Sequence, residues 1–141
     1  MIKVYLNSPG GSVVDGYGLI DAILASETPV YTINQAACFS MALLIFMAGH
    51  KRYSMEHSEF LLHDGASGGF DSSSKMQDRM KFESEQVEKM TKDFVVGHSK
   101  ISESVYDANL RREWYFLSKE GKELGVVDYI IGIDCALSDV I

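Results

Sequence analysis

The sequence of 141 residues contains little cysteine and no tract that resembles a linker. Its two cysteines, Cys38 and Cys135, both lie in apolar surroundings. So few thiols argue against a disulfide framework and indicate a reducing compartment, such as the cytoplasm. Internal repeats, low-complexity tracts and interdomain linkers are also absent. We therefore expect residues 1–141 to form a single domain.

The sequence also has no excess of basic residues and no long hydrophobic run. The 20 acidic residues outnumber the 13 basic ones and give a net charge of −7, which argues against nucleic acid or an anionic membrane as the main partner. The longest apolar run, residues 41–49, is far shorter than the roughly 20 residues needed to cross a bilayer. The first residues become polar at "NSPGG" before a secretory signal could form.

The apolar content is high enough for a real core, since hydrophobic residues make up 46% of the sequence. Residues 2–6 are typical of a strand, residues 13–25 carry apolar side chains at helical spacing, and residues 30–33 are typical of a second strand. This order predicts a β-α-β unit and a parallel sheet. Functional sites of such sheets gather at the carboxyl ends of the strands.

The remainder of the sequence predicts further short elements. Residues 41–49 indicate a buried helix, residues 52–54 and 60–62 two strands, and residues 64–74 a loop rich in glycine and serine. Apolar residues at helical spacing predict a long amphipathic helix over residues 75–96. A shorter helix is expected over residues 101–110, and near the end we expect a helix capped by Ser118 and terminated by Gly125, followed by a last strand.

The first strand runs directly into Pro-Gly-Gly in "LNSPGGSV", residues 6–13. Such a turn leaves backbone N–H groups bare beside whatever binds there. The N–H of Gly11 is suited to form half of an oxyanion hole, with the N–H after a nucleophilic serine as the other half. The chemistry therefore depends on what faces this turn.

Two side chains have the chemistry to face it. Ser40, in "CFSM", begins the buried helix, where a serine is either a helix cap or a nucleophile. His63 follows the strand "FLL", where an imidazole is either structural or a general base for a serine hydroxyl. The other histidines, His50, His57 and His98, have polar or charged neighbours and are expected at the surface.

The order and wording of these motifs resemble the proteolytic subunits of the Clp protease family and their phage-type relatives, within the crotonase-like superfamily. The resemblance rests on "LNSPGG", "CFSM", "FLLH" and "FLSKEGKELGVVD" and covers essentially the whole chain. It implies an α/β fold of repeated β-β-α (spiral) units with a protruding handle strand and helix at about residues 64–97. It also implies a domain without the amino-terminal segment that family members carry before the first strand.

The resemblance implies a serine endopeptidase that needs no metal and no cofactor. It makes Ser40 the nucleophile and His63 the general base, and the backbone N–H groups of Gly11 and Met41 the oxyanion hole. The third member of the family's triad is an aspartate, and Glu113 stands at the matching position here. Asp107 is the nearest upstream acid that could replace it, although its spacing fits less well.

Partners and departures also follow from the resemblance. The implied partners are a peptide or unfolded protein substrate, further copies of the chain in heptameric or double rings, and a AAA+ unfoldase. The methionines of the long helix then lie in an interface between subunits. Phe39 is bulky beside Ser40 and is expected to narrow the site, whereas Cys38 has no matching position and reads as a packed core thiol.

These departures keep two other functions open. One is a catalytically weak scaffold or regulatory subunit in mixed rings, suggested by Glu113, Phe39 and the expected lack of the amino-terminal segment. The other is a crotonase-type enzyme acting on an acyl-CoA thioester, which has a similar oxyanion hole but does not need a serine–histidine pair.

Overall fold

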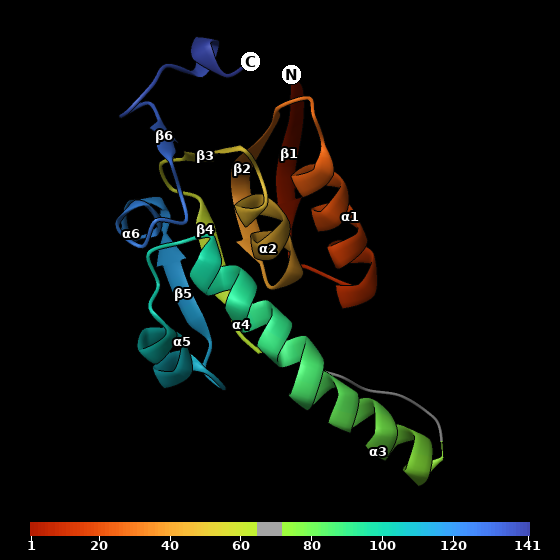
Figure 1. Ribbon diagram of the computed structural model, residues 1–141. Helices are drawn as coiled ribbons and strands as arrows, with labels where there is room; N and C mark the ends of the chain where they lie inside the picture. The colour runs from red at the N-terminus through yellow and green to blue at the C-terminus, as the bar shows by residue number, and fades with distance from the viewer. Residues whose placement is uncertain (65–71) are drawn as a thin grey trace.

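The computed structural model describes residues 1–64 and 72–141 and shows an α/β fold around one curled sheet (Figure 1). Its strands are β1 (Ile2–Ser8), β2 (Val30–Phe39), β3 (Lys51–Met55), β4 (Glu59–Leu62), β5 (Trp114–Leu117) and β6 (Tyr129–Ile131). Its helical segments are α1 (Val13–Ala25), α2 (Met41–Met47), α3 (Ser73–Phe82), η1 (Glu83–Val87), α4 (Glu88–Gly97), α5 (Glu103–Asn109), α6 (Ser118–Glu123) and η2 (Leu137–Asp139). The predicted β-α-β unit, β1-α1-β2, is confirmed, and β1 pairs with β2 in parallel.

Strand β2 organises the sheet because it changes partner along its length. It pairs in parallel with β3 through residues 31–34 and then with β4 through residues 37–39. The buried Asn34 lies at this change: its side-chain amide donates to the Glu59 carbonyl at 3.1 Å, and its carbonyl oxygen accepts from the Ala36 N–H at 3.1 Å. The switch brings the carboxyl end of β4 beside the carboxyl end of β2.

The core lies between the sheet and the helices packed against it. Its largest fully buried side chains include Leu43 and Phe46 of α2 and Phe60 of β4. Helix α1 buries Ile20 and Ile23 there. Val14, Leu19 and Leu24, which are apolar residues of the same predicted helix, are exposed instead.

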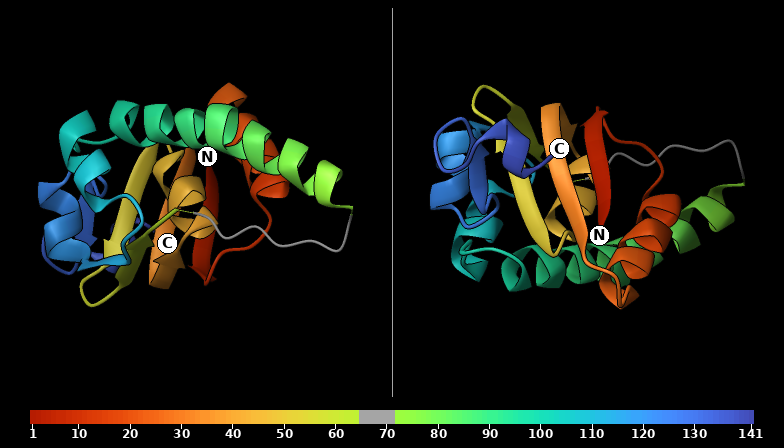
Figure 2. Two further views of the ribbon diagram at one scale, coloured as in Figure 1. Left: turned by 90° about the horizontal axis from the view of Figure 1, so that it is seen from below. Right: turned by 90° about the horizontal axis from the view of Figure 1, so that it is seen from above.

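The long predicted helix is confirmed as α3, η1 and α4, which follow one another from Ser73 to Gly97. Its middle segment η1 is a π-helical turn. The carboxyl-terminal half packs on the core through the buried Val95, whereas the amino-terminal half extends beyond the sheet (Figures 1 and 2). The expected handle strand falls on residues 65–71, outside the described residues. In the described part of the chain, no helix is long and apolar enough to span a bilayer.

Helix α6 ends as predicted but begins differently. Gly125 has a left-handed φ of +71°, which lets the chain leave the helix after Glu123. The predicted cap at Ser118 is wrong, because Ser118 is the first residue of the helix and makes no capping hydrogen bond. Its hydroxyl is buried instead, where it donates to the Met55 carbonyl at 2.6 Å. Ser118 therefore ties α6 to the end of β3.

Candidate active site

Ser40 occupies the sharp turn between β2 and α2. Its φ of +57° and ψ of −123° are sparsely populated for any residue but glycine, and such a conformation costs about 1–3 kcal/mol. Two backbone bonds hold it there: its N–H donates to the Leu61 carbonyl at 2.9 Å, and its carbonyl accepts from the Leu43 N–H at 3.0 Å. Although Ser40 stands at the cap position, its hydroxyl makes no capping hydrogen bond. Of the two sequence interpretations, the side-chain cap is therefore wrong.

The Pro-Gly-Gly turn lies directly against this serine, and Gly10 makes the close approach. Gly10 has a φ of +104°, and a Cβ on it would lie 2.8 Å from the Phe39 carbonyl oxygen and 3.0 Å from Ser40 Cβ. A Cβ on Gly11 would meet nothing within 4 Å. Sequence reasoning singled out Gly11 for its N–H and missed Gly10, although the glycine pair after a strand was the signal for both.

The backbone donors expected beside Ser40 lie at these two turns. Among the described residues no hydrogen bond of the Gly11 N–H is found. Met41 is the first residue of α2, so its N–H has no acceptor within the helix. The N–H of Met41 directly follows Ser40, and a Cβ on Gly10 would lie 3.2 Å from its nitrogen. The glycine turn and the start of α2 thus border the same small space.

His63 and Glu113 contact each other, with 3.0 Å between His63 Nδ1 and Glu113 Oε1. The sheet register explains this contact. Strand β4 pairs with β5 in antiparallel orientation, and Leu62 lies opposite Trp114, so the next residue on one strand faces the preceding residue on the other. The His63 side chain is 22% exposed and that of Glu113 is 58% exposed. Glu113 therefore contacts the imidazole from the solvent side.

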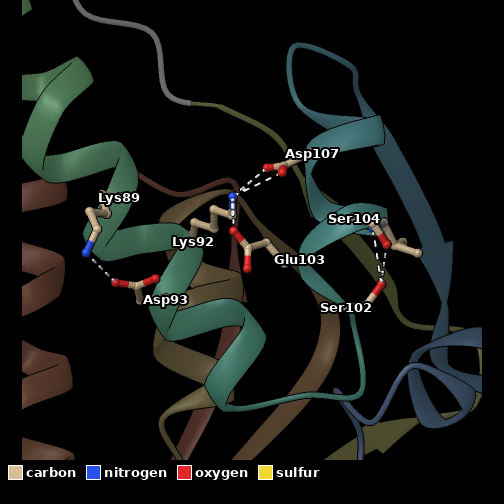
Figure 3. A network of polar contacts seen from close by, with 8 residues as sticks. Lys89, Lys92, Asp93, Ser102, Glu103, Ser104 and Asp107 are labelled. Atoms are coloured by element: carbon tan, nitrogen blue, oxygen red, sulfur yellow. Dashed lines mark hydrogen bonds and ion pairs between the residues drawn. The ribbon is translucent and has the colours of Figure 1, made fainter.

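Asp107, the alternative acid, is engaged elsewhere. Its carboxylate lies 2.9 Å from Lys92 Nζ, and Glu103 lies 2.9 Å from the same nitrogen (Figure 3). The hydrogen bonds that Lys92 donates to Asp107 and then to Glu103 raise its pKa to about 12. Asp107 thus joins α5 to α4, and of the two candidate acids it is Glu113 that contacts His63.

Ser40 and His63 line one cavity of about 120 Å³. Its walls are largely apolar and come from α2, β4, the long helix and the end of α5: Met41, Leu44, Leu62, Val87 and, directly after α5, Leu110. Among the described residues no hydrogen bond joins the Ser40 hydroxyl to His63. The structure therefore places Ser40 and His63 at one cavity and pairs His63 with Glu113. A hydrogen bond between the Ser40 hydroxyl and His63 is not formed.

Cys38 and Phe39, the two residues before Ser40, do not line this cavity. The ring of Phe39 packs edge-to-face on Tyr115, with 5.8 Å between the ring centroids. The expectation that Phe39 narrows the site is therefore wrong for this cavity. Cys38 is fully buried, as expected for a core thiol, and burial raises its pKa to about 12.

This burial predicts a clear difference between the two thiols. A thiol with a pKa of about 12 is only about 10⁻⁴ thiolate at pH 8, and the thiolate is the reactive form. We expect iodoacetamide to alkylate the half-buried Cys135 of the folded protein and to reach Cys38 only after unfolding in urea. Mass spectrometry of the peptides measures both sites. Labelling of Cys38 in the folded protein at the rate of Cys135 would contradict the prediction.

The remaining histidines do not approach Ser40. His57 is exposed, and His50 is exposed while its Nδ1 accepts from the Val30 N–H at 2.8 Å. His98 is half-buried and stacks on Phe94 at 4.2 Å, so the expectation of a surface position is wrong for this residue. Within residues 1–64 and 72–141, no group of three or more His, Cys, Asp or Glu side chains is placed to hold a metal ion.

Fold and site together define an α/β protein in which a serine in a strained turn shares a cavity with a histidine that contacts a carboxylate. A sequence model of the Clp protease family matches residues 1–134. The chain therefore belongs to the Clp protease family.

Similar proteins carry the name ATP-dependent Clp protease proteolytic subunit. The protein of that name from Bacteroides fragilis is 30% identical over 135 residues, which cover 92% of this chain and 63% of the relative. That of Porphyromonas gingivalis is 30% identical over 132 residues, covering 92% of this chain and 59% of the relative. The chain thus spans about three fifths of the length of these relatives.

Proposed function

We propose that this protein is a serine endopeptidase that cleaves peptides or unfolded polypeptides through an acyl-enzyme. Ser40 is the nucleophile, His63 the general base and Glu113 the acid that orients it. One observation carries the proposal. The Ser40 hydroxyl makes no capping hydrogen bond, and Ser40 lines the same cavity as His63, whose Nδ1 contacts the Glu113 carboxylate. Membership of the Clp protease family supports the same chemistry.

The reaction follows from these roles. His63 Nε2 accepts the proton of the Ser40 hydroxyl as Oγ bonds to the substrate carbonyl carbon, and the resulting oxyanion is held by the N–H groups of Gly11 and Met41. His63 then gives the proton to the leaving amine as the C–N bond breaks, and water hydrolyses the ester by the same steps. Serine–histidine contacts often tighten only when substrate binds. The proposal therefore includes that substrate binding forms the hydrogen bond between the Ser40 hydroxyl and His63 Nε2.

A fluorophosphonate probe tests the nucleophile. The probe phosphonylates a serine only when a base activates its hydroxyl and the oxyanion is stabilised. We expect one label per chain, on the peptide that contains Ser40, and no label on the Ser40→Ala variant. An assembled sample that stays unlabelled at Ser40 while a known serine peptidase in the same tube reacts would contradict the proposal.

The acid is tested by a matched pair of substitutions. Glu113→Gln keeps the size of the side chain but removes the charge that orients His63, and we expect it to lower kcat/KM for a peptide by about 10²-fold. Glu113→Asp, which retains a carboxylate, should keep more activity than Glu113→Gln. Asp107→Asn removes the same charge from a carboxylate that binds Lys92 and is the control. Equal losses in Asp107→Asn and Glu113→Gln would contradict the role of Glu113.

We further propose that the chain works as a homo-oligomer, in heptameric or double rings, with a AAA+ unfoldase. Exposed apolar side chains support assembly: they lie on the outer face of α1 and along the long helix, at Val13, Val14, Leu19, Leu24, Met76, Met80 and Met90. The phrase "ATP-dependent" in the names of the similar proteins supports an unfoldase partner. In such an assembly an extended substrate pairs through its main chain with the segment after the glycine turn and with the handle strand.

One observation favours a second candidate, a catalytically weak subunit that supports other subunits in a mixed ring. Among the described residues the Ser40 hydroxyl and His63 are not hydrogen bonded, and the carboxylate that orients His63 is more than half exposed. Peptidase activity of the isolated homo-oligomer that disappears in Ser40→Ala would exclude this candidate.

A further inference from the structure

One carboxylate at the cavity beside Ser40 has no partner of its own. Glu88 lines the cavity and is half-buried, and its carboxylate makes no hydrogen bond or ion pair with any described residue. The other charged groups of the lining are paired: Arg79 lies 2.9 Å from Glu83, and Asp64 lies 3.4 Å from Arg111. Glu88 therefore gives the cavity an uncompensated negative charge.

The nearest cation of its own helix does not neutralise Glu88. Lys92 stands one turn further along α4, at the spacing at which a glutamate and a lysine commonly pair. Lys92 instead contacts Glu103 and Asp107 of α5, each at 2.9 Å (Figure 3). Two carboxylates thus occupy the ammonium that stands one turn from Glu88, and the neighbouring Lys89 pairs with Asp93 at 3.4 Å, so the charge of Glu88 remains available to a ligand.

Neutral polar groups lie near Glu88 in the same cavity. Burial, followed by electrostatic interactions with Tyr17, Glu88 and Asp64, raises the pKa of Tyr106 to about 12, so its hydroxyl stays protonated at neutral pH. Thr91 lies within one turn of Glu88, and its hydroxyl is 2.6 Å from the Tyr17 hydroxyl. The cavity therefore combines apolar walls with a region that holds a carboxylate and hydroxyl groups.

A long side chain with a cationic end matches this combination. The methylene groups of lysine or arginine pack on apolar walls, while the charged end needs a carboxylate and hydrogen-bond acceptors. Ser40 and His63 line the cavity. A substrate side chain that enters it therefore belongs to the residue whose carbonyl is attacked, which is the residue before the cleaved bond. Building on the proposed peptidase function, we infer that Glu88 makes this cavity select lysine or arginine at that position of the substrate.

Peptides that differ at one side chain test this inference. Two fluorogenic peptides are compared on the assembled protein, one with lysine and one with norleucine before the cleaved bond, since norleucine keeps the methylene chain without the charge. We expect kcat/KM to be about two- to five-fold higher for lysine, the range that one partly exposed ion pair supports. In Glu88→Gln the ratio of the two values should fall by a similar factor.

Glu85→Gln is the matched control, because Glu85 is an exposed glutamate of the same helix that does not line the cavity. It removes the same charge and should leave the lysine-to-norleucine ratio as in the wild type. A ratio near one, or a ratio that Glu88→Gln does not change while peptides are still cut, would overturn the inference and leave the proposed function standing. Failure to cut either peptide would overturn the proposed function and this inference with it.

Discussion

Replacing Ser40 by alanine is expected to lower peptide turnover by about 10³-fold or more, because nucleophile and base act as a unit and the loss of one removes the covalent step. The fold should be retained. Ser40 holds its place through its backbone N–H and carbonyl, and alanine keeps both of these bonds. The hydroxyl itself makes no capping hydrogen bond that alanine would lose. Turnover and stability are therefore expected to separate in this variant.

Turnover is measured with a fluorogenic peptide on assembled protein, and stability by thermal unfolding. Ser104→Ala is the control, since it removes a hydroxyl from the exposed first turn of α5. Cys38→Ala excludes the thiol as the nucleophile and should leave turnover measurable. Turnover of Ser40→Ala within about ten-fold of the wild type would assign the chemistry to another group.

Replacing Gly10 by alanine is expected to destabilise the protein by about 2–4 kcal/mol and to lower turnover as well. The φ of +104° is strained for any residue with a Cβ. The new Cβ would also press on the Phe39 carbonyl oxygen at 2.8 Å, which is backbone and cannot turn away. Relief of this contact moves the turn away from Ser40, and with it the Gly11 N–H, one of the two groups proposed to hold the oxyanion.

Urea unfolding of Gly10→Ala and Gly11→Ala measures this effect with a control one residue away. Gly11 has an ordinary φ, and a Cβ there meets nothing within 4 Å. We therefore expect Gly11→Ala to unfold within about 0.5 kcal/mol of the wild type, as is usual for an open surface site. Equal stability of the two variants would show that the turn does not lie against Ser40 as the structure has it.

The site could be predicted from the sequence to the extent that strand order and motif spacing fix neighbours. Ser40 and His63 each follow a strand, and parallel pairing of β2 with β4 brings the ends of those strands together. The position of Glu113 came from a resemblance, and the antiparallel register of β5 explains why it faces His63. The catalytic roles of these residues remain predictions.

Features that depend on three-dimensional contacts could not be predicted. The sequence does not show which glycine of a pair approaches Ser40, since both fit a turn and only packing distinguishes them. It also predicted a cap at Ser118, because a serine before a helix usually caps it, whereas here the hydroxyl is buried against the end of β3. Apolar residues such as Leu19 lie at helical spacing with core residues, yet their side chains are exposed. Hydrophobic periodicity alone does not distinguish a face that packs on the core from an exposed apolar face.

The π-helical turn Glu83–Val87 sets the angle about the helix axis at which the side chains of α3 stand relative to those of α4. A π-turn carries one residue more than an α-turn, so it offsets the azimuth of everything before it by about 100° relative to an uninterrupted helix. Deleting one residue there would restore regular winding and swing Arg79 away from the cavity, together with the exposed Met76 and Met80. The shape of the cavity wall and the direction of the outward methionines thus change together, by insertion or deletion of a single residue.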